Sequence, residues 1–514
     1  MSVPLSPELL LLGTLGAMDG AVPPARDVVL EPSSVEFVVT TWEESVLRGR
    51  PWVPHRRLAT LESGTRLKVV GEVKSRDEKG CKGDKWYAVL PFGYVCSLHV
   101  RETEKPPTLD SVNPLDAGKR LPFNYVFVRE DDTPMYATWA DLESGTPTRP
   151  LTKGMSLSVA KVSEFDGQKY VKTTKGELVP QSGVRWGGQG SNWSGVTLQG
   201  EHHGPSFAWV TQPKVNVRDA PNKHAKIIGA VLRRQRVPLL RDNGEMGKAR
   251  FFEIAPGQWV AASELNEVHL IDVPEQVVTD WRARETGNDQ WIDVDLGEQV
   301  LVAYRGEQPV FATLISSGRS HATPMGNYPI WAKVGSMDMG NQPYEDRPYL
   351  VQGVPWVLLF QGHNALHGAY WHDSFGRKKS HGCVNLAPLD ARWVFEWAGP
   401  AMRTGWSGLL PEDLDRSVVV HVRDSSRAPG QQWTQERKIG PPDREKEAQL
   451  AEEADERRAR EAEQLAQSAN FLPHAENARA PTVGPAKLES GGPPSLNHLP
   501  PPPTKREGSG GVAD

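Results

Sequence analysis

Alternating apolar and polar positions recur along the chain and predict a mainly β protein. Three stretches, WYAVLPFGYV, YVKTTKGELV and FFEIAPGQWV, each place an aromatic residue six positions before a glycine and an apolar residue two positions after it. The three glycines, Gly93, Gly176 and Gly257, are almost evenly spaced. Alternation on both sides of a glycine turn is typical of a hairpin in a small β-barrel. The pattern therefore predicts one small β unit repeated three times.

Strand signals around the third hairpin indicate what kind of unit is repeated. VNVRDAPNKHAKIIGAV is typical of a strand, a proline-containing turn and the start of another strand. This opening resembles that of bacterial SH3-like modules, so we expect SH3-like small β-barrels at residues 31–105, 120–190 and 205–270, the second being the least similar. The resemblance implies modules that bind cell-wall peptides or pack against a catalytic domain. A structural spacer without a ligand is the alternative.

The sequence between the second and third units changes character. RWGGQGSNWSGVTLQG is rich in glycine and serine and predicts a linker. Residues 274–424 then return to strand patterns: WIDVDL alternates, QVLVAYRG and QPVFATLISSG are typical of successive strands, and VPWVLLF is typical of a buried strand. We expect a further β-rich domain there.

The two ends of the chain differ from the middle. Residues 1–30 contain a short apolar stretch followed by small residues, as in a secretion signal, but the first basic residue is Arg26, and a misassigned start site is the alternative. Within residues 425–514, the charged run at 443–467 predicts a solvated single helix or, alternatively, a coiled coil. The Pro/Gly-rich end is expected to be disordered.

Composition narrows the classes of function. The chain has 514 residues, of which 38% are hydrophobic and 24% are charged, as in a soluble protein of several domains. A net charge of −5 offers no basic surface, so nucleic acid is not an expected partner. No apolar run approaches the roughly 18 residues that a membrane-spanning helix needs, so no transmembrane segment is expected.

The chain has three cysteines. Cys81 and Cys96 lie in one β-patterned segment, where a disulfide across neighbouring strands is one interpretation and two unpaired, half-buried thiols are the other. In an oxidising compartment the disulfide would leave Cys383 as the odd thiol.

Cys383 ends the segment HNALHGAYWHDSFGRKKSHGC, which also contains His363, His367, His372 and His381. A zinc site would need other spacings: no second cysteine lies nearby, and glycines around the first two histidines argue against a helical histidine pair. We therefore expect no metal and no cofactor.

The same segment fits a cysteine nucleophile. A free thiol has a pKa of about 8.5, so an imidazole must take its proton or stabilise the thiolate. His381 points the same way as Cys383 if the segment is extended, but a turn at Gly382 would change this; His367 would reach the sulfur from a neighbouring strand. The amides of Gly382 and Cys383 fit an oxyanion hole. These groups serve acyl transfer.

SHGC at residues 380–383, preceded by HG at 367–368, resembles the signature of the YkuD-type L,D-transpeptidases of bacterial cell walls. In that family an aliphatic residue and then arginine or asparagine follow, and here Val384 and Asn385 do so. VDLGEQVLVAYRGEQPVFATLISSG resembles the opening strands of the family, and ATPMGNYPI resembles its Thr-Pro-x-Gly-x-Tyr turn. The resemblance implies a YkuD-type β-sandwich catalytic domain at 274–424.

The resemblance also implies roles for individual residues. Cys383 would be the nucleophile and His367 the general base, oriented by the backbone carbonyl of Gly368. The implied oxyanion and pocket residues are Gly382, Ser380, His381, Gly368 and Asn385. Candidate substrate contacts in the following loop are Tyr370, Trp371, His372 and Asp373; a local hydrogen-bonded turn is the alternative for the last two.

The function implied by the resemblance is peptidoglycan L,D-transpeptidation by a cysteine acyltransferase. Such an enzyme forms a thioester with the third, diamino acid residue of a stem peptide, releases D-Ala, and transfers the acyl group to an amine. The expected partners are donor and acceptor stem peptides, with a wall-attached protein as a further candidate, and the substrate implies export to the periplasm or cell wall. An L,D-carboxypeptidase, a hydrolase that releases wall-attached protein, and a wall-binding protein with an inactive catalytic domain are the alternatives.

Overall fold

The structure is a computed structural model of the chain. It describes residues 28–53, 56–75, 81–83, 85–108, 115–198, 206–244, 249–274, 277, 289–340, 349–411, 414–427, 441 and 443–469. The expected leader up to residue 27 and the expected disordered tail from residue 470 lie outside the described residues. The chain divides into two compact units, residues 1–455 and 456–514.

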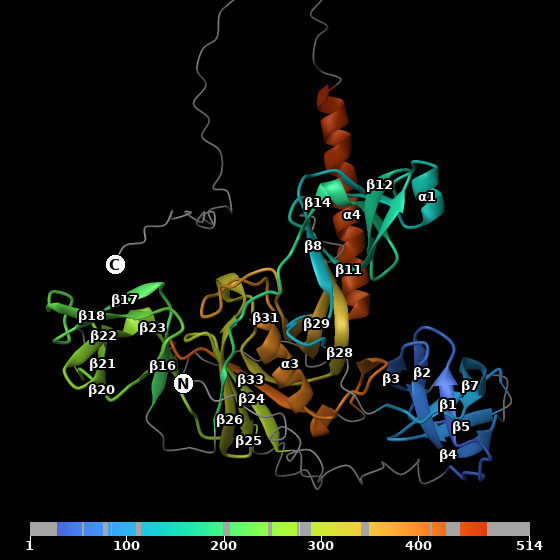
Figure 1. Ribbon diagram of the computed structural model, residues 1–514, viewed down its shortest axis with the longest axis horizontal. Coiled ribbons are helices and arrows are strands. Elements are labelled where there is room, and N and C mark those ends of the chain that lie inside the picture. Colours follow the sequence, from blue (N-terminus) through green and yellow to red (C-terminus); the bar gives the residue numbers. More distant parts are fainter. Residues whose placement is uncertain are drawn as a thin grey trace, which may run out of the picture. The chain divides into compact units, whose positions relative to one another are not determined.

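Strands dominate the regular structure of the described residues (Figure 1), which confirms the prediction of a mainly β protein. The first unit from the N-terminus comprises β1 (Phe37–Thr40), β2 (Ser45–Arg48), β3 (Arg57–Leu61), β4 (Arg66–Lys74), β5 (Lys85–Val89), β6 (Tyr94–Cys96) and β7 (Val100–Thr103). The second unit comprises β8 (Asn124–Val128), β9 (Thr133–Met135), α1 (Trp139–Glu143), β10 (Arg149–Leu151), β11 (Ser156–Phe165), β12 (Gln168–Thr173), β13 (Leu178–Pro180) and β14 (Val184–Trp186). The third unit comprises β16 (Phe207–Val210), β17 (Lys214–Arg218), β18 (Ile227–Leu232), β19 (Arg236–Pro238), β20 (Arg241–Asp242), β21 (Phe251–Ala255), β22 (Gln258–Ala261) and β23 (Leu265–Val268).

These three units share one strand-pairing scheme. The predicted hairpins are β5–β6, β12–β13 and β21–β22, each followed by a single-turn 3-10 helix and a last strand. The first strand of each unit pairs antiparallel with both the last strand and a central strand: β1 with β7 and β4, β8 with β14 and β11, β16 with β23 and β19. This double pairing places the first strand of each unit between the last strand and a central one. The repeat therefore extends to whole strand arrangements, including the second unit.

The segment between the second and third units is packed, so the prediction of a linker there was wrong. β15 (Val196–Thr197) pairs with β26 (Gln308–Ser316) of the next domain. The Trp193 side chain is only 6% exposed, and its indole N–H donates to the Thr313 hydroxyl at 2.9 Å. Glycine and serine give a chain freedom only where nothing anchors it, and here a buried tryptophan does.

The strands of the β-rich domain that follows agree with the predicted patterns. They are β24 (Gln290–Asp295), β25 (Val300–Arg305), β26, β27 (Gly326–Pro329), β28 (Ala332–Gly340), β29 (Leu350–Gln361), β30 (Asn364–Gly368), β31 (Val384–Leu386), β32 (Trp406–Leu409) and β33 (Val419–Arg423). One layer runs β27–β33–β24–β25–β26, and the other runs β32–β28–β29–β30–β31. β26 also pairs with β31 at Ile315 and Ser316, so a single long strand joins the two layers.

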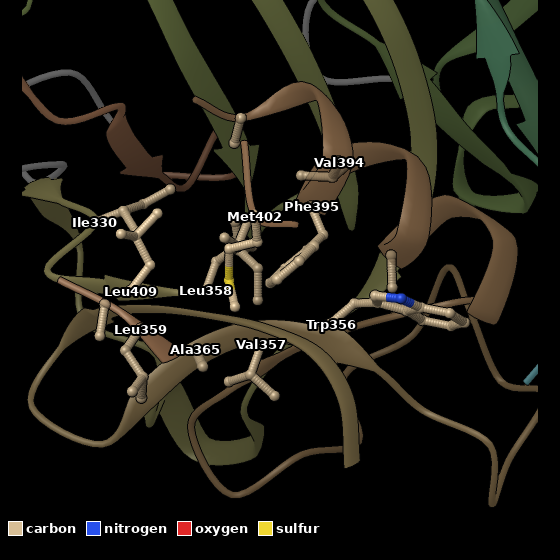
Figure 2. Packing of buried hydrophobic residues seen from close by; sticks show 14 of the residues in the cluster. Ile330, Trp356, Val357, Leu358, Leu359, Ala365, Val394, Phe395, Met402 and Leu409 are labelled. Atoms are coloured by element: carbon tan, nitrogen blue, oxygen red, sulfur yellow. The ribbon is translucent and has the colours of Figure 1, made fainter. Parts of the chain in front are cut away.

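Helix α3 (Pro388–Trp397) follows β31 directly and packs on β29 and β30. Figure 2 shows part of the resulting core, in which Val394 and Phe395 of the helix lie beside Trp356 and Leu358 of β29. Each of these side chains is at most 1% exposed, and burying one contributes roughly 1.5–3 kcal/mol. The core thus fixes the backbone of β30 and β31, the two strands that flank the candidate nucleophile.

The charged run near the C-terminus forms α4 (Arg444–Ala469), which confirms the helix predicted at 443–467. Within the described residues, no helix has both the length and the apolar character needed to cross a membrane.

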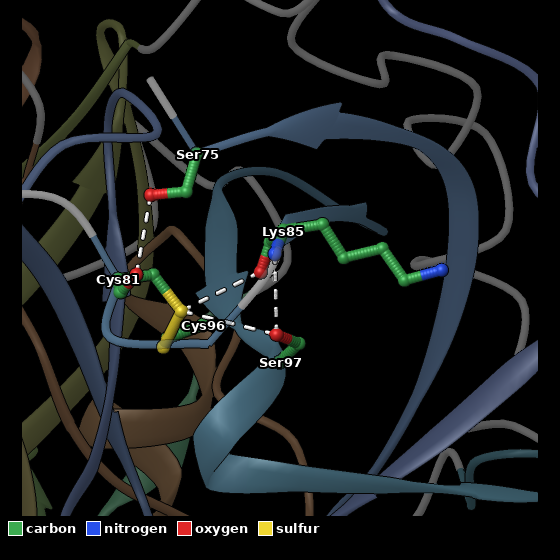
Figure 3. The surroundings of a disulfide bond; sticks show 5 residues. All are labelled: Ser75, Cys81, Lys85, Cys96 and Ser97. Atoms are coloured by element: carbon green, nitrogen blue, oxygen red, sulfur yellow. Dashed lines mark hydrogen bonds between the residues drawn. A yellow bond between two sulfur atoms is a disulfide. The ribbon is translucent and has the colours of Figure 1, made fainter. Parts of the chain in front are cut away.

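Cys81 and Cys96 are joined by a disulfide, with their Cα atoms 5.4 Å apart (Figure 3). Cys96 ends β6, whereas Cys81 lies in the loop before β5 and not on a neighbouring strand. The Ser75 hydroxyl donates to the Cys81 carbonyl at 3.1 Å. The bond therefore ties a loop to the end of the β5–β6 hairpin and leaves Cys383 as the free cysteine.

Candidate active site

The candidate base and nucleophile come from two strands that lie side by side. β30 and β31 pair in parallel, and the register places His367 opposite Asn385. Cys383 immediately precedes β31, two positions before Asn385. Opposed residues in neighbouring strands point to the same face of a sheet, so the imidazole of His367 lies on the face to which Asn385 points. The His-Gly pair at 367–368 and the Ser-His-Gly-Cys segment at 380–383, which a long loop separates in the sequence, thus come together through β30 and β31.

Hydrogen bonds within the motif fix the bend that carries Cys383. The Ser380 hydroxyl donates to the Cys383 carbonyl and accepts from the Gly382 N–H at 3.1 Å. The Thr323 hydroxyl donates to the Gly382 carbonyl at 2.8 Å and accepts from the Gly318 N–H at 2.8 Å. Ser380 therefore organises the loop from inside, and Thr323 ties it to the end of β26.

Gly382 is a glycine because its neighbours leave no room for a side chain. A Cβ at this position would lie 2.4 Å from Asn364 Oδ1. The chain bends here and is not extended, so His381 does not lie beside the sulfur in the way an extended segment would place it. The His381 side chain is exposed, and its ring centroid lies 5.4 Å from that of Tyr349.

The Thr-Pro-x-Gly-x-Tyr turn positions Thr323. The phenol of Tyr328 is fully buried and donates to the Met325 carbonyl at 2.7 Å. Gly326 has φ of 146°, and a Cβ there would lie within 3.0 Å of three atoms of the Tyr328 phenol. The turn thus folds back over its own tyrosine, which places the threonine hydroxyl under the nucleophile loop.

At neutral pH the candidate nucleophile is a thiol. Its Sγ donates to the His363 carbonyl at 3.7 Å. Burial raises the pKa of Cys383 to about 11, and a backbone N–H from Ala365 opposes this shift. A thiolate therefore does not form by itself, and a base must remove the proton as the substrate is attacked.

His367 is suited to be that base. Its Nδ1 lies 3.3 Å from the Gly368 carbonyl. A carbonyl can only accept, so Nδ1 carries the proton and Nε2 keeps a lone pair. Burial lowers the pKa of His367 to about 4, with the Gly368 carbonyl opposing, so the ring is neutral above mildly acidic pH. Trp371 stacks on it with centroids 5.7 Å apart and limits its rotation.

His372 reaches the same strand as the nucleophile. Its Nδ1 accepts from the Ser374 N–H at 3.2 Å, and its Nε2 lies 2.8 Å from the side-chain amide of Asn385. Burial lowers its pKa to about 3, and the charge of Lys379 adds to this effect, so the ring is neutral. The atom of Asn385 in this contact is the amide nitrogen Nδ2, and its amide oxygen has no hydrogen-bond partner among the described residues. His372 and Asn385 therefore form a defined polar pair in register with His367.

The other candidate substrate contacts are differently placed. The Tyr370 ring stacks on Tyr125 with centroids 3.6 Å apart, and its hydroxyl lies 2.9 Å from Ser156 Oγ. Its hydroxyl also donates to the Gln352 carbonyl at 2.8 Å. Asp373 forms ion pairs with Arg233 and Arg234 of the third unit. Tyr370 and Asp373 thus make packing and ion-pair contacts with the preceding units, whereas Trp371 and His372 face the motif.

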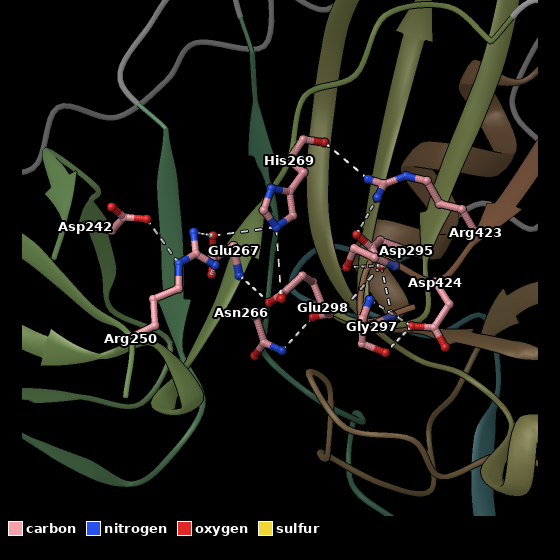
Figure 4. A network of polar contacts seen from close by, with 12 residues as sticks. Asp242, Arg250, Asn266, Glu267, His269, Asp295, Gly297, Glu298, Arg423 and Asp424 are labelled. Carbon is pink, nitrogen blue, oxygen red and sulfur yellow. Dashed lines mark hydrogen bonds and ion pairs between the residues drawn. The ribbon is translucent and has the colours of Figure 1, made fainter. Parts of the chain in front are cut away.

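Among the described residues, Glu267, His269 and Glu298 have side chains that could share a metal ion, with ligand atoms within 4.8 Å of one another (Figure 4). Arg250 already binds both oxygens of Glu267, at 2.9 and 3.3 Å. Glu298 Oε2 accepts from the Glu267 N–H at 2.7 Å, and burial raises the pKa of Glu298 to about 7. We interpret this group as an ion-pair network between β23 and the β24–β25 turn.

Sequence reasoning found the Thr-Pro-x-Gly-x-Tyr turn but missed the role of Thr323, which follows from its bonds to Gly382 and Gly318. It also missed the backbone groups of His363 and Ala365 beside the sulfur. The motif signal pointed to Thr323, whereas no pattern of side chains signals a backbone contact.

Comparisons with known proteins match the part of the chain that contains these residues. The family model of the L,D-transpeptidase catalytic domain, YkuD, matches residues 289–420. YciB of Bacillus subtilis (strain 168), whose name assigns it provisionally as an L,D-transpeptidase, is 28% identical over 126 residues, which cover 21% of this chain and 59% of the relative.

Solved structures are similar over part of the chain. A mutant L,D-transpeptidase of Enterococcus faecium is 22% identical and covers 26% of this chain and 49% of its own, with a TM-score of 0.21. An L,D-transpeptidase from Mycobacterium smegmatis is 17% identical and covers 45% of this chain and 100% of its own, with a TM-score of 0.22. Among the curated proteins, the match to YciB spans 59% of the length of that relative. By sequence, residues 289–420 match the family model of the YkuD-type L,D-transpeptidase catalytic domain.

Proposed function

We propose that the protein is a peptidoglycan L,D-transpeptidase in which Cys383 is the nucleophile and His367 the general base. The observation that carries this proposal is the parallel register of β30 and β31, in which His367 lies opposite Asn385, two positions after Cys383. The free Nε2 of His367, opposite its bond to the Gly368 carbonyl, supplies the proton acceptor.

The reaction begins when Sγ attacks the carbonyl carbon of the third, diamino acid residue of a donor stem. The thiol proton leaves the His363 carbonyl and passes to His367 Nε2, so the charge develops on sulfur only as the S–C bond forms. His367 then gives this proton to the amine of the departing D-Ala, and a thioester remains on Cys383. An acceptor amine of a second stem, or of a wall-attached protein, attacks the thioester and His367 takes its proton. The C–S bond then breaks, and His367 returns this proton to the departing Cys383 Sγ.

The carbonyl oxygen of the substrate carries negative charge in both tetrahedral intermediates. The Cys383 N–H at the bend is the first candidate donor to it. The Gly382 N–H already donates to Ser380 Oγ at 3.1 Å. We infer that this second amide either shares its hydrogen with the oxyanion or keeps the loop in shape for the first.

Two further features of the proposal concern the rest of the chain. The Cys81–Cys96 disulfide supports folding in an oxidising compartment, which fits export to the periplasm or cell wall. The strand-pairing scheme that the three units share supports SH3-like modules in all of them.

The test uses the full chain and a disaccharide tetrapeptide, with the products weighed by mass spectrometry. A crosslinked dimer and loss of D-Ala are expected, together with an acyl adduct on Cys383. Tripeptide alone would show hydrolysis in place of transfer, and no product would indicate a protein that only binds the wall. Replacing Cys383 with Ala should abolish the adduct, whereas the double variant C81S/C96S, which keeps Cys383, should still form it.

A further inference from the structure

The loop between the candidate base and nucleophile is held by residues from outside the catalytic domain. The third unit contacts this loop at three residues of the segment DSFGR (373–377), namely Asp373, Gly376 and Arg377. The Asp373 carboxylate pairs with two arginines, the Gly376 carbonyl accepts from Asn266 Nδ2 at 3.2 Å, and Arg377 donates to Gln212 Oε1 at 2.7 Å. These contacts tie both ends of this segment to the third unit.

Arg234 makes the central contact. Its guanidinium pairs with the Asp373 carboxylate, and the same nitrogen lies 3.4 Å from the Asp373 carbonyl. Its side chain is only 17% exposed and lies over the Trp193 ring, 5.5 Å from the centroid. Arg233 supports it with a nitrogen 3.6 Å from Asp373 Oδ2. Both arginines and the Ser191 hydroxyl favour the charged carboxylate and hold the pKa of Asp373 below its usual range, against the effect of burial.

The backbone at Arg234 is unusual in a way that fits this contact. The residue lies in the turn between β18 and β19 with φ of 69°, in the left-handed region that non-glycine residues rarely adopt. Its N–H donates to the Val210 carbonyl at 2.8 Å, so the turn is anchored to the first strand of the unit. A large side chain held in this conformation marks a position where direction matters.

Arg234 binds Asp373, which is the residue next to His372 of the candidate active site. Asp373 follows His372 directly, and His372 Nε2 lies 2.8 Å from the amide of Asn385, the residue opposite His367 in the register. Asp373 turns outward to the third unit while His372 turns inward. Fixing the first therefore fixes the direction of the second.

We propose that Arg234 of the third unit is a positioning residue for the active site. Its ion pair with Asp373 holds the 369–377 loop so that His372 binds Asn385 beside the base. The third unit is then a part of the catalytic apparatus, in addition to any wall ligand it takes. This inference rests on the proposed transpeptidase function.

The main test compares steady-state crosslinking by four full-chain variants. R234A and D373N should each lower kcat by about 10–100-fold, as misplacement of a catalytic group by about 1 Å does, with KM changed by less than about twofold. The losses of the two single variants should not multiply in the double variant R234A/D373N, because both substitutions remove the ion pair between Arg234 and Asp373. R234K, which keeps a charge and donors at this site, should recover part of the loss.

R241A is the matched control, because Arg241 also forms an ion pair in the third unit, with Glu253 at 2.6 Å. It should keep the kcat of the wild type. The inference is overturned if R234A keeps wild-type kcat, if R241A is as slow as R234A, or if the single-variant losses multiply in the double variant.

A second readout does not need the transpeptidase reaction. The loop contains RKK at residues 377–379, which trypsin cuts when the segment is mobile. Native-state cleavage there should be at least about tenfold faster in R234A than in the wild type or R241A. If no protein makes crosslinks but R234A is cut faster, the proposed function fails while the positioning contact stands; if cleavage is unchanged, the positioning role is overturned.

Discussion

The Thr323 hydroxyl donates a 2.8 Å hydrogen bond to the backbone carbonyl of Gly382, across 59 residues of sequence. The same oxygen accepts from the Gly318 N–H, so both its donor and its acceptor capacity are used in a buried place. This single side chain links the Thr-Pro-x-Gly-x-Tyr turn to the Ser-His-Gly-Cys loop. The two motifs are therefore one structural device, in which the turn supports the bend that presents Cys383.

Replacing Thr323 with Val should test that device. Valine keeps the shape but leaves a buried carbonyl and a buried N–H without partners, which costs roughly 1–3 kcal/mol for each group. We expect acyl-adduct formation on Cys383 to slow by at least about tenfold, measured by mass spectrometry over time. Thr211→Val is the matched control, because Thr211 also donates to a carbonyl, that of Glu264 at 3.0 Å, but within the third unit. Equal acylation rates for the two variants would contradict the assigned role.

The role of His367 predicts a rate effect and not a folding effect. Replacing it with Ala should lower the acylation rate by about 10²–10⁴-fold, the usual contribution of a general base. His421 provides the comparison, because it is also buried, and burial likewise lowers its pKa to about 4. Its Nδ1 is paired with Asn327 Oδ1 at 2.7 Å, in the layer formed with β33. H421A should therefore affect stability more than rate, and similar rate losses in both variants would contradict a base role for His367.

The pH dependence follows from the direction of two shifts. The pKa of His367 is lowered to about 4, so its base form persists to lower pH than that of an ordinary imidazole. The acid limb of kcat/KM should therefore fall near pH 4, well below 6.5. An acid limb centred at 6.5 would show that the ring is solvated in the free enzyme.

The thiol gives the corresponding prediction at high pH. Burial raises the pKa of Cys383 to about 11, so the reactive thiolate accumulates only in alkaline solution. The rate of alkylation by iodoacetamide in the absence of substrate should keep rising beyond pH 9. A plateau reached by pH 8 would reveal a preformed thiolate–imidazolium pair and replace general-base attack by attack of a resting ion pair.

Much of the fold is readable from the sequence, because the strands of the catalytic domain are long and their apolar patterns are unambiguous. VPWVLLF, for example, forms the buried centre of β29. The failures have physical causes. Composition predicted a linker, but Trp193 is buried and bonds to Thr313 of β26, and such a contact between distant segments is a tertiary property. Cys81 was expected on a strand and lies in a loop.

The candidate site divides in the same way. Motif spacing alone pointed to Cys383 and His367, and the parallel pairing of their strands explains that spacing. The neutral state of the Cys383 thiol depends on burial. The opposite directions of His372 and Asp373 depend on the contact of Asp373 with the third unit. No local pattern contains that information, because Arg234 is separated from Asp373 by 139 residues.

The disulfide gives a prediction that is local to the first unit. Cys81 and Cys96 enclose a loop with a sequence separation of 15, and closing a loop of this size stabilises the folded state by about 3 kcal/mol in the chain-entropy description. Because a chain of several domains does not unfold in one step, the measurement should be local hydrogen exchange. In C81S/C96S, amides of β5 and β6 should exchange about 100-fold faster than in the wild type. Amides of β21 and β22, the corresponding hairpin of the third unit without a disulfide, should be unchanged. Unchanged exchange in β5 and β6 would mean that hairpin packing alone, around the buried Trp86 and Tyr94, sets their stability.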